Sequence, residues 1–315
     1  MTDLGTDWSR SLGLQVPVVN APMGGAAGGT LAAAVSRAGG LGMVGMGSAG
    51  TVERLSVELG RLRNLGQPFG IGLLDWALAE QPDLLPIALA ARPALLSVSF
   101  GDTWQWIRQV HDDGVQTAAQ VSDLRSARRA VDAGVDVVIV RGAEAGGHGS
   151  PRVGTLPLLA ELLDELPVPV LAAGGVSSGR ALAAVLAAGA SGAWIGTAFA
   201  ACAESLTPEP ARRVLVDACD TDTVTTRIFD VAQGYPWPEH LPERVVRDAV
   251  VDRWEGREHE LAADRDARAE LAATLAESTF GVNAGQGVAS VKSVWSAADV
   301  IADMSLGARG LLGRW

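Results

Sequence analysis

Short apolar segments alternate along the chain with longer segments in which apolar residues recur at helical spacing. Eight of the short segments are expected to be strands: Val16–Asn20, Leu41–Val44, Phe69–Leu73, Leu95–Ser99, Val115–Gln120, Val137–Arg141, Val168–Ala172 and Gly192–Ile195. The segments between them, such as Thr51–Asn64 and Asp123–Ala133, are expected to be helices. Strands that alternate with helices form a parallel sheet, so the pattern predicts an α/β protein with a closed (β/α)8 barrel, a TIM barrel.

The pattern changes after about Thr207, where prolines become frequent and the density of charged residues rises. Arg244–Glu260 and Leu261–Glu277 are expected to be helices, and a last helix is expected near Ala297–Ser305. We therefore predict that residues 1–206 and 285–315 form the barrel. Residues 207–284 are predicted to form a C-terminal helical cap, inserted before the last helix, that covers the barrel mouth.

Composition and charge limit the kinds of molecule that the protein is expected to bind. The 315 residues are 48% hydrophobic and 19% charged, as in a globular protein, and the formal net charge is −11. This charge argues against nucleic acid or an anionic membrane as a main partner. The first residues lack the pattern of a signal peptide, and Cys202 and Cys219 show no disulfide or metal spacing. We expect a cytoplasmic protein, and we expect the uncharged segment Ala181–Ala203 to be core because glycines interrupt it.

The loop after the sixth strand carries the strongest candidate for chemistry. Val137–Arg141 runs into a segment with four glycines, and His148 lies between Gly147 and Gly149. Active sites of such barrels form at the carboxyl ends of the strands, and a histidine there can transfer protons near neutral pH. The alternative is a glycine-rich turn with an incidental surface histidine.

The loops after the last two strands are suited to holding a phosphate. Gly174 and Gly175 follow the seventh strand, and Gly196 and Thr197 follow the eighth. Exposed backbone N–H groups at these positions attract phosphate without a lysine. Each glycine pair is also compatible with a simple tight turn, but the two pairs together favour phosphate binding.

Other strand ends offer further candidate contacts. The turn Ala21-Pro22-Met23 follows the first strand, where its backbone can meet the edge of a planar ring, although such a turn also simply ends a strand. Gln120 and Arg141 end the fifth and sixth strands and are either ligand contacts or solvated loop residues.

The remaining polar candidates are given structural roles. Glu144 is expected to orient the histidine loop by accepting backbone N–H bonds, and three further histidines, His111, His240 and His259, are expected at the surface. The spacing of His, Asp and Glu suggests no metal site. Trp237, Trp254 and Trp295 are candidates for core packing, the cap–barrel junction or the contact of a homodimer.

Several motifs resemble those of one enzyme family. They are Asn20-Ala21-Pro22-Met23, Ala38-Gly39-Gly40-Leu41-Gly42, Gly142-Ala143-Glu144-Ala145-Gly146-Gly147-His148, Ala172-Ala173-Gly174-Gly175-Val176 and Ile195-Gly196-Thr197-Ala198-Phe199. Their order is similar to that of the nitronate monooxygenases, formerly called 2-nitropropane dioxygenases. The similarity is strong over about Val16–Ser205, and the Glu-Ala-Gly-Gly-His block is its most specific part.

The resemblance implies an FMN-dependent barrel enzyme in which His148 is the catalytic base or orients the substrate. By position, Met23, Gly146 and Gly147 would border the flavin, and Gly175, Gly196 and Thr197 would hold its phosphate. Two positions depart from the pattern of many relatives, which have asparagine in place of Gly72 and glutamine in place of Arg141. The fixed charge of Arg141 suggests a preference for an anionic reduced flavin or an acidic substrate.

These observations favour oxidation of alkyl nitronates or nitroalkanes with oxygen to a carbonyl compound and nitrite. One alternative is an NAD(P)H-dependent flavin reductase of quinones or enoyl thioesters. A second alternative is a flavin-binding accessory protein without turnover.

Overall fold

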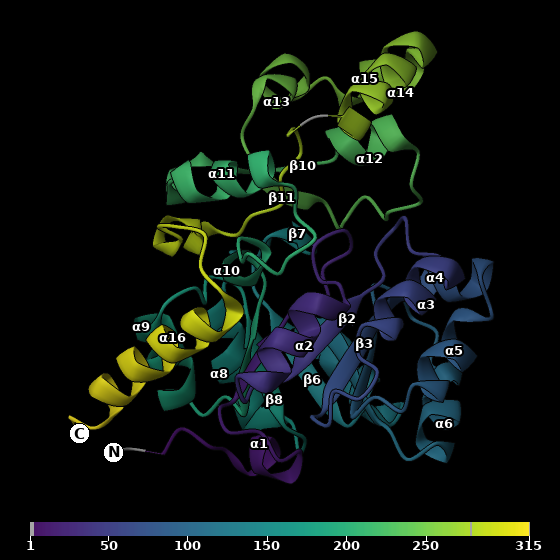
Figure 1. Cartoon of the computed structure of the whole chain (residues 1–315). Coiled ribbons are helices and arrows are strands. Elements are labelled where there is room, and N and C mark those ends of the chain that lie inside the picture. Colours follow the sequence, from purple (N-terminus) through teal and green to yellow (C-terminus); the bar gives the residue numbers. More distant parts are fainter. Residues whose placement is uncertain (1–2, 278, 315) are drawn as a thin grey trace.

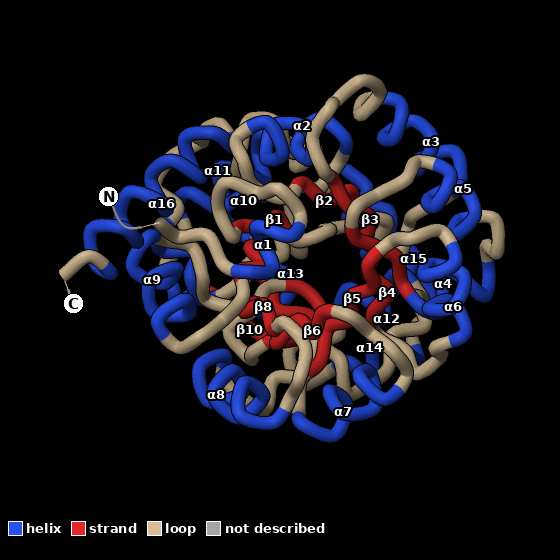
Figure 2. The backbone as a smooth tube through the Cα atoms, turned by 90° about the horizontal axis from the view of Figure 1, so that it is seen from below, coloured by secondary structure: helices blue, strands red, loops and turns tan. Residues whose placement is uncertain are grey.

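Eight parallel strands form a ring at the centre of the protein (Figure 2). The computed structural model describes residues 3–277 and 279–314. Around the ring the order is β1, β9, β8, β6, β5, β4, β3 and β2, and a bridge between Val19 and Leu41 joins β2 back to β1. The strands are β1 (Val18–Asn20), β2 (Gly42–Gly45), β3 (Phe69–Leu74), β4 (Leu95–Ser99), β5 (Gln116–Val121), β6 (Val137–Arg141), β8 (Val170–Ala173) and β9 (Gly192–Ile195). The predicted barrel and all eight of its strands are confirmed.

Helices surround the ring and follow the strands in turn (Figure 1). They are α2 (Gly29–Arg37), α3 (Val52–Gly60), α4 (Asp75–Glu80), α5 (Leu84–Ala90), α6 (Gln105–Asp112), α7 (Leu124–Asp132), α8 (Thr155–Glu165), α9 (Gly179–Ala187) and α10 (Thr197–Ala200). The side chains of Thr51, Asp123 and Ser178 accept N–H bonds that begin α3, α7 and α9. The terminal helix α16 (Ala297–Leu312) packs against α9 and α2, so the predicted return of the chain to the barrel is confirmed.

Two apolar layers stabilise the barrel. Inside the ring, buried side chains such as Met43, Ile139 and Trp194 fill the interior, as expected for a barrel of eight strands. The short helix α1 (Asp7–Ser11) lies across the lower end (Figures 1 and 2), where Trp8 joins this inner cluster. A larger cluster lies between the strands and the outer helices. The lower end is therefore filled, and the upper end carries the loops.

The cap lies over the upper end of the barrel in Figure 1. It contains α11 (Glu209–Asp217), the 3-10 helix η1 (Asp220–Asp222), β10 (Thr223–Thr226), α12 (Ile228–Gln233), β11 (Glu243–Val246), α13 (Ala249–Trp254), α14 (Glu258–Ala263) and α15 (Arg265–Glu277). A second 3-10 helix, η2 (Gln286–Ser290), follows it. An apolar cluster that includes Phe229, Val251 and Leu261 is separate from the barrel clusters.

The prediction of one helix over Arg244–Glu260 is wrong. The first residues form strand β11, in which Glu243 and Val245 are both buried, and Asp248 then caps α13. Gly256 adopts a φ of 75° just after α13, so the helix ends there. The second predicted helix, Leu261–Glu277, begins earlier as α14 and is interrupted at Asp264 before α15.

A small sheet connects the cap to the histidine loop. β11 pairs antiparallel with β10 on one side and with β7 (Gly147–His148) on the other. In this register Glu243 lies opposite His148, and Arg244 lies opposite Gly147. The cap therefore determines where the histidine stands.

The uncharged segment Ala181–Ala203 divides into α9, β9 and α10 and belongs to the barrel, as predicted. Among residues 3–277 and 279–314, no helix combines the length and the apolar character needed to cross a bilayer.

Candidate active site

His148 is held by a loop whose backbone only glycine adopts readily. Gly147 has a φ of 68° and Gly149 a φ of 152°, both in the region that side chains with a Cβ avoid. A Cβ on Gly149 would lie 2.2 Å from Nη1 of Arg141. The N–H of Gly149 donates to the carbonyl of Pro242 at 3.1 Å, which fixes the loop to the chain that leads into β11. Both glycines that flank His148 are therefore required by the conformation and packing of the loop.

Arg141 holds this loop through hydrogen bonds to the loop backbone. Its guanidinium is buried, and Nη2 donates to the carbonyls of Ala145, Gly146 and Gly147 at 3.2, 3.2 and 2.7 Å. Burial, with a smaller contribution from the charge of Arg244, lowers the pKa of Arg141 to about 10, so the group stays charged at neutral pH. In this structure the side chain of Arg141 makes its hydrogen bonds to the loop backbone.

Glu144 has the structural role that the sequence suggested. Its carboxylate accepts the backbone N–H of Thr155, at 2.8 Å to Oε2, and the hydroxyl of the same residue at 3.0 Å. This ties the histidine loop to the first turn of α8, and the prediction that Glu144 accepts backbone N–H bonds is confirmed.

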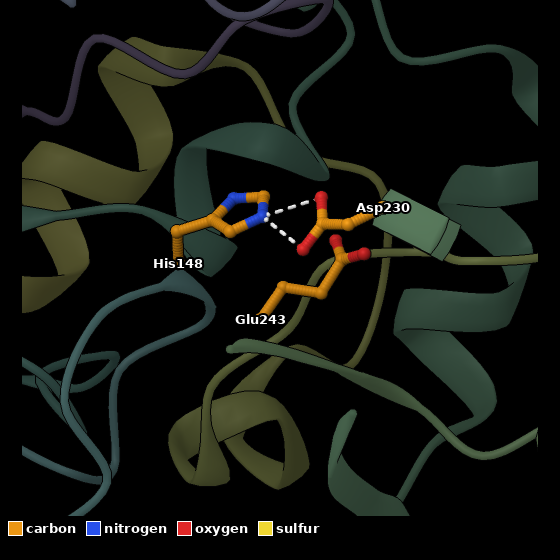
Figure 3. Close-up of side chains that lie close together, drawn as sticks. All are labelled: His148, Asp230 and Glu243. Atoms are coloured by element: carbon orange, nitrogen blue, oxygen red, sulfur yellow. Dashed lines mark hydrogen bonds and ion pairs between the residues drawn. The ribbon is translucent and has the colours of Figure 1, made fainter. Parts of the chain in front are cut away.

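The imidazole of His148 has an acidic partner from the cap. Nε2 lies 2.9 and 3.0 Å from the two carboxylate oxygens of Asp230 in α12 (Figure 3). Both side chains are largely buried, with 14% and 7% exposure. Because an ionised carboxylate can only accept hydrogen bonds, Nε2 must carry the proton. Nδ1 of a neutral ring then has a free lone pair, and Figure 3 shows it pointing away from Asp230.

Glu243 lies beside this pair. The carboxylates of Glu243 and Asp230 and a ring nitrogen of His148 offer atoms that all lie within 4.8 Å of one another (Figure 3). Burial first, and the charge of Asp230 second, raise the pKa of Glu243 to about 8, while a hydrogen bond with Asn283 acts in the opposite direction. Glu243 is therefore mostly a neutral acid at neutral pH.

The same three side chains form a group that sequence spacing did not suggest, and groups of this kind can hold a metal ion. However, the hydrogen bond from Nε2 to Asp230 occupies the ring nitrogen nearest the two carboxylates. A protonated Glu243 is also a poor ligand. The chemistry of this arrangement fits proton transfer better than metal binding.

Trp237 covers one face of the imidazole. The two rings are parallel within 4°, with their centres 3.6 Å apart. Nε1 of Trp237 donates to the hydroxyl of Ser48 at 2.9 Å, and the rings of Phe100 and Trp76 pack edge-to-face with the ring of Trp237. Phe100, at the end of β4, has a φ of 70°, a conformation that is unfavourable for a residue with a bulky side chain. The side of His148 that faces Trp237 is thus apolar and closed.

The two proposed phosphate loops present free backbone N–H groups. Gly174 and Gly175 have φ values of 114° and 71°. Among the residues that the structure describes, the N–H groups of Gly175, Val176 and Thr197 donate no hydrogen bond. Val176 and Thr197 are buried. Buried donors without a protein partner are expected where a ligand oxygen binds, so these loops fit a phosphate group.

The other predicted contacts lie at the same end of the barrel. Sδ of Met23 is 3.5 Å from the place where a Cβ of Gly196 would stand, so the loops after β1 and β9 are adjacent. The N–H of Ala21 donates to the carbonyl of Ile195 at 2.8 Å. Gln120 is half-buried at the end of β5, and its N–H donates to Ser99.

The structure gives a reason for one departure from the family pattern. A Cβ on Gly72 would lie 2.3 Å from the ring of Pro22. Asparagine therefore does not fit here unless the turn Ala21-Pro22-Met23 moves. In this chain the proline ring occupies the space that a side chain at residue 72 would need.

Sequence reasoning found His148 but missed its partners Asp230, Glu243 and Trp237. Asp230 had one visible signal, since it is a single acid in the apolar run Ile228–Ala232. Glu243 had no signal, because its burial follows from the pairing of β11 with β7. The predicted surface positions of His111, His240 and His259 are confirmed.

Comparisons with known proteins agree with this geometry. The model of the nitronate monooxygenase family matches residues 8–88 and 83–307. The nitronate monooxygenase of Pseudomonas aeruginosa is 34% identical over 300 residues, which covers 79% of this chain and 82% of that protein. A second relative, from Mycobacterium tuberculosis, is (3aS,4S,5R,7aS)-5-hydroxy-7a-methyl-1-oxo-octahydro-1H-indene-4-carboxyl-CoA dehydrogenase. It is 32% identical over 257 residues, or 80% of this chain and 69% of that protein.

Solved structures show the same relationship. FabK from Thermotoga maritima superposes with a TM-score of 0.85 at 28% identity, over 98% of this chain and 97% of that one. The nitroalkane oxidase of Streptomyces ansochromogenes gives a TM-score of 0.80 at 29% identity, over 98% of this chain and 100% of that one. The chain therefore belongs to the nitronate monooxygenase family, a family of flavin-dependent oxidoreductases, and is an enzyme.

Proposed function

We propose that this enzyme binds FMN and oxidises alkyl nitronates, or nitroalkanes after deprotonation, with oxygen to a carbonyl compound and nitrite. The observation that carries the proposal is the fixed imidazole of His148, whose Nδ1 is free while Nε2 is held by Asp230. This group lies at the same end of the barrel as the unpaired N–H groups of Gly175 and Thr197. The similarity to nitronate monooxygenases supports the same reaction.

The loops after β8 and β9 would hold the phosphate of FMN through backbone N–H groups, mainly those of Gly175, Val176 and Thr197. The turn Ala21-Pro22-Met23 and the residues Gly146 and Gly147 would border its ring, with Gln120 at the neighbouring strand end. When bound, the flavin supplies the electron acceptor that the oxidation requires. No lysine is needed for the phosphate, which suits an acidic protein.

His148 would act as the base toward a nitroalkane. The C–H bond next to the nitro group breaks, its electron pair moves onto the nitro group, and the proton passes to Nδ1. Asp230 stabilises the imidazolium that results, and Trp237 prevents the ring from rotating out of place. A preformed nitronate has already lost this proton and needs His148 only for orientation.

The first test is the purified enzyme itself. We expect a flavin spectrum, release of FMN rather than FAD on acid denaturation, and consumption of oxygen with formation of nitrite when an alkyl nitronate is added. Absence of nitrite with a set of primary and secondary nitronates would contradict the proposed reaction. Release of FAD would contradict the cofactor assignment alone.

The second candidate function is an NAD(P)H-dependent reductase of quinones or thioesters. It is favoured by the similarity to a relative that is named a carboxyl-CoA dehydrogenase. Anaerobic addition of NADH or NADPH separates the two functions. Rapid loss of flavin absorbance with a nicotinamide donor, without loss on addition of a nitronate, would favour the reductase. Full flavin occupancy with neither response would contradict both functions.

We further propose that residues 207–284 form a cap domain, because their apolar cluster is separate from those of the barrel. A homodimer also stays a proposal. Trp237 and Trp254 are buried within this chain, whereas Trp295 is 42% exposed and is the remaining tryptophan candidate for a subunit contact. Sedimentation of the wild type and of Trp295→Ser tests it: dissociation of a dimer in the variant is expected.

A further inference from the structure

Two buried carboxyl groups lie close to the imidazole of His148. Asp230 comes from α12 and Glu243 from β11, and both are buried, at 6% and 5% exposure. They lie with a ring nitrogen of His148 in a group whose atoms are all within 4.8 Å of one another. Two like charges this close, away from water, strongly disfavour the state in which both are ionised.

The surroundings show which carboxyl keeps its charge. Both oxygens of Asp230 lie within hydrogen-bond distance of Nε2 of His148, where an ionised carboxylate can accept the ring N–H. Glu243 faces Asp230 and His148, receives a hydrogen bond from the neutral amide of Asn283, and lies opposite Thr226 on β10. Among the described residues no arginine or lysine forms an ion pair with Glu243.

We propose that Asp230 and Glu243 act together as the positioning group of His148, with Asp230 ionised and Glu243 protonated in the working enzyme. The single negative charge fixes the proton of the neutral imidazole on Nε2. Nδ1 is then the atom that accepts the proton of the substrate. The raised pKa of Glu243 is consistent with this state, because it keeps the acid neutral through pH 7.

The arrangement has a consequence for pH dependence. When Glu243 releases its proton to solvent near pH 8, a second negative charge appears next to Asp230, and the repulsion between the two carboxylates disturbs the hydrogen bond that positions His148. A ring that is no longer held in position is a poorer base toward the substrate. The rate with a neutral nitroalkane is therefore expected to fall above about pH 8, whereas a preformed nitronate does not depend on this step.

The kinetic test rests on the proposed function and compares Glu243→Gln with Asp230→Asn in the flavin-loaded enzyme. Glutamine imitates the protonated acid, so Glu243→Gln is expected to keep kcat/KM for nitroalkane within about threefold at pH 7 and to lose the decrease above pH 8. Asp230→Asn removes the charge and is expected to lower kcat/KM by about 10²- to 10⁴-fold, with a much smaller effect on nitronate. Glu209→Gln, which removes an exposed carboxylate on α11, is the control and should behave as wild type.

A second readout does not need turnover, so it separates failure of this inference from failure of the proposed function. Nitrogen-15 NMR of labelled histidines, of which the chain has four, reports the tautomer of each ring. His148, identified by its absence in His148→Gln, is expected as the neutral Nε2–H form at pH 7, and its ring nitrogen shifts are expected to change near pH 8 in wild type but not in Glu243→Gln.

Four results would overturn the inference, and three of them concern the histidine and the Glu243→Gln variant. They are an Nδ1–H tautomer at pH 7, a Glu243→Gln variant with the same alkaline transition as wild type, and a Glu243→Gln variant as inactive as Asp230→Asn. A divalent metal bound in equal amount with the protein, whose removal by a chelator abolishes activity, would also overturn it. In that case the three side chains would be metal ligands.

Discussion

Arg141 shows how one residue can hold the backbone next to another residue of the site. Its three hydrogen bonds to successive carbonyls hold the backbone from Ala145 to Gly147, immediately before His148. The sequence suggested a charge next to the flavin, and that hypothesis stays a prediction. The contacts of the guanidinium indicate a second effect, on loop geometry, that any substitution of Arg141 will also produce.

Arg141→Gln is expected to loosen this loop, since glutamine can reach at most one or two of the carbonyls. Loss of a hydrogen bond to a charged group costs about 1.5–3 kcal/mol, so we expect the free energy of unfolding to fall by roughly 2 kcal/mol. Urea denaturation measures it, and Arg63→Gln at an exposed position is the control. Unchanged stability and unchanged amide exchange in Gly146–Gly149 would contradict the supporting role.

At the scale of single elements, close backbone contact joins the histidine loop to the segment before η2. A Cβ on Gly146 would lie 2.6 Å from the carbonyl carbon of Ala284 and 2.7 Å from the nitrogen of Gly285. The N–H of Gly285 in turn donates to Oγ1 of Thr197, and the N–H of Gln286 donates to the carbonyl of Glu144. One segment thus spans the histidine loop and a phosphate loop.

Gly146→Ala should separate these two segments, because backbone atoms cannot give way as a flexible side chain can. We expect weaker retention of flavin on dilution and a lower melting temperature. Gly60→Ala is the matched control, because nothing lies within 4 Å of its added Cβ, and alanine favours a helix by up to about 1 kcal/mol. A Gly146→Ala variant that keeps flavin as tightly as Gly60→Ala would contradict this account.

The barrel elements were predictable because each strand is a short apolar run bounded by glycine, proline or a capping residue. Central strands of a parallel barrel are buried on both faces, which gives the clearest sequence signal. The cap elements were not predictable from the sequence, because β10 and β11 are short and mixed in polarity. β11 is a strand because it pairs with β7 and β10. This tertiary pairing outweighs the local helical pattern of its sequence.

At the scale of the whole molecule, the site is assembled from both parts of the protein. The barrel supplies His148 and the glycine loops, and the cap supplies Asp230, Trp237 and Glu243. Loops at the carboxyl ends of barrel strands are predictable from fold rules, whereas contacts between distant segments depend on how the cap packs. For this reason the sequence indicated the base but not the groups that orient it.

The ionisation of Glu243 also affects the free energy of unfolding of the whole protein. Its pKa is raised from the usual 4.5 to about 8 in the folded protein, so the folded state binds a proton that the unfolded state has released. The contribution of this group to the free energy of unfolding must therefore decrease as pH rises from about 4.5 to about 8, and then stay constant.

Glu243→Gln is expected to remove that decrease. Urea denaturation at several pH values measures the free energy of unfolding. The value for the variant minus that for wild type should rise between pH 5 and 8 and stay constant above pH 8. Glu209→Gln on the exposed face of α11 serves as control. A difference that is flat from pH 5 to 8 would mean that Glu243 is ionised throughout.

The most direct test of the central claim is the response of His148→Ala to two forms of one substrate. Measured at pH 7, turnover of a neutral nitroalkane should fall by about 10²- to 10⁴-fold, because the base is lost, whereas turnover of the corresponding preformed nitronate should fall far less. Equal losses on both forms, or no loss on either, would show that His148 does not remove the proton.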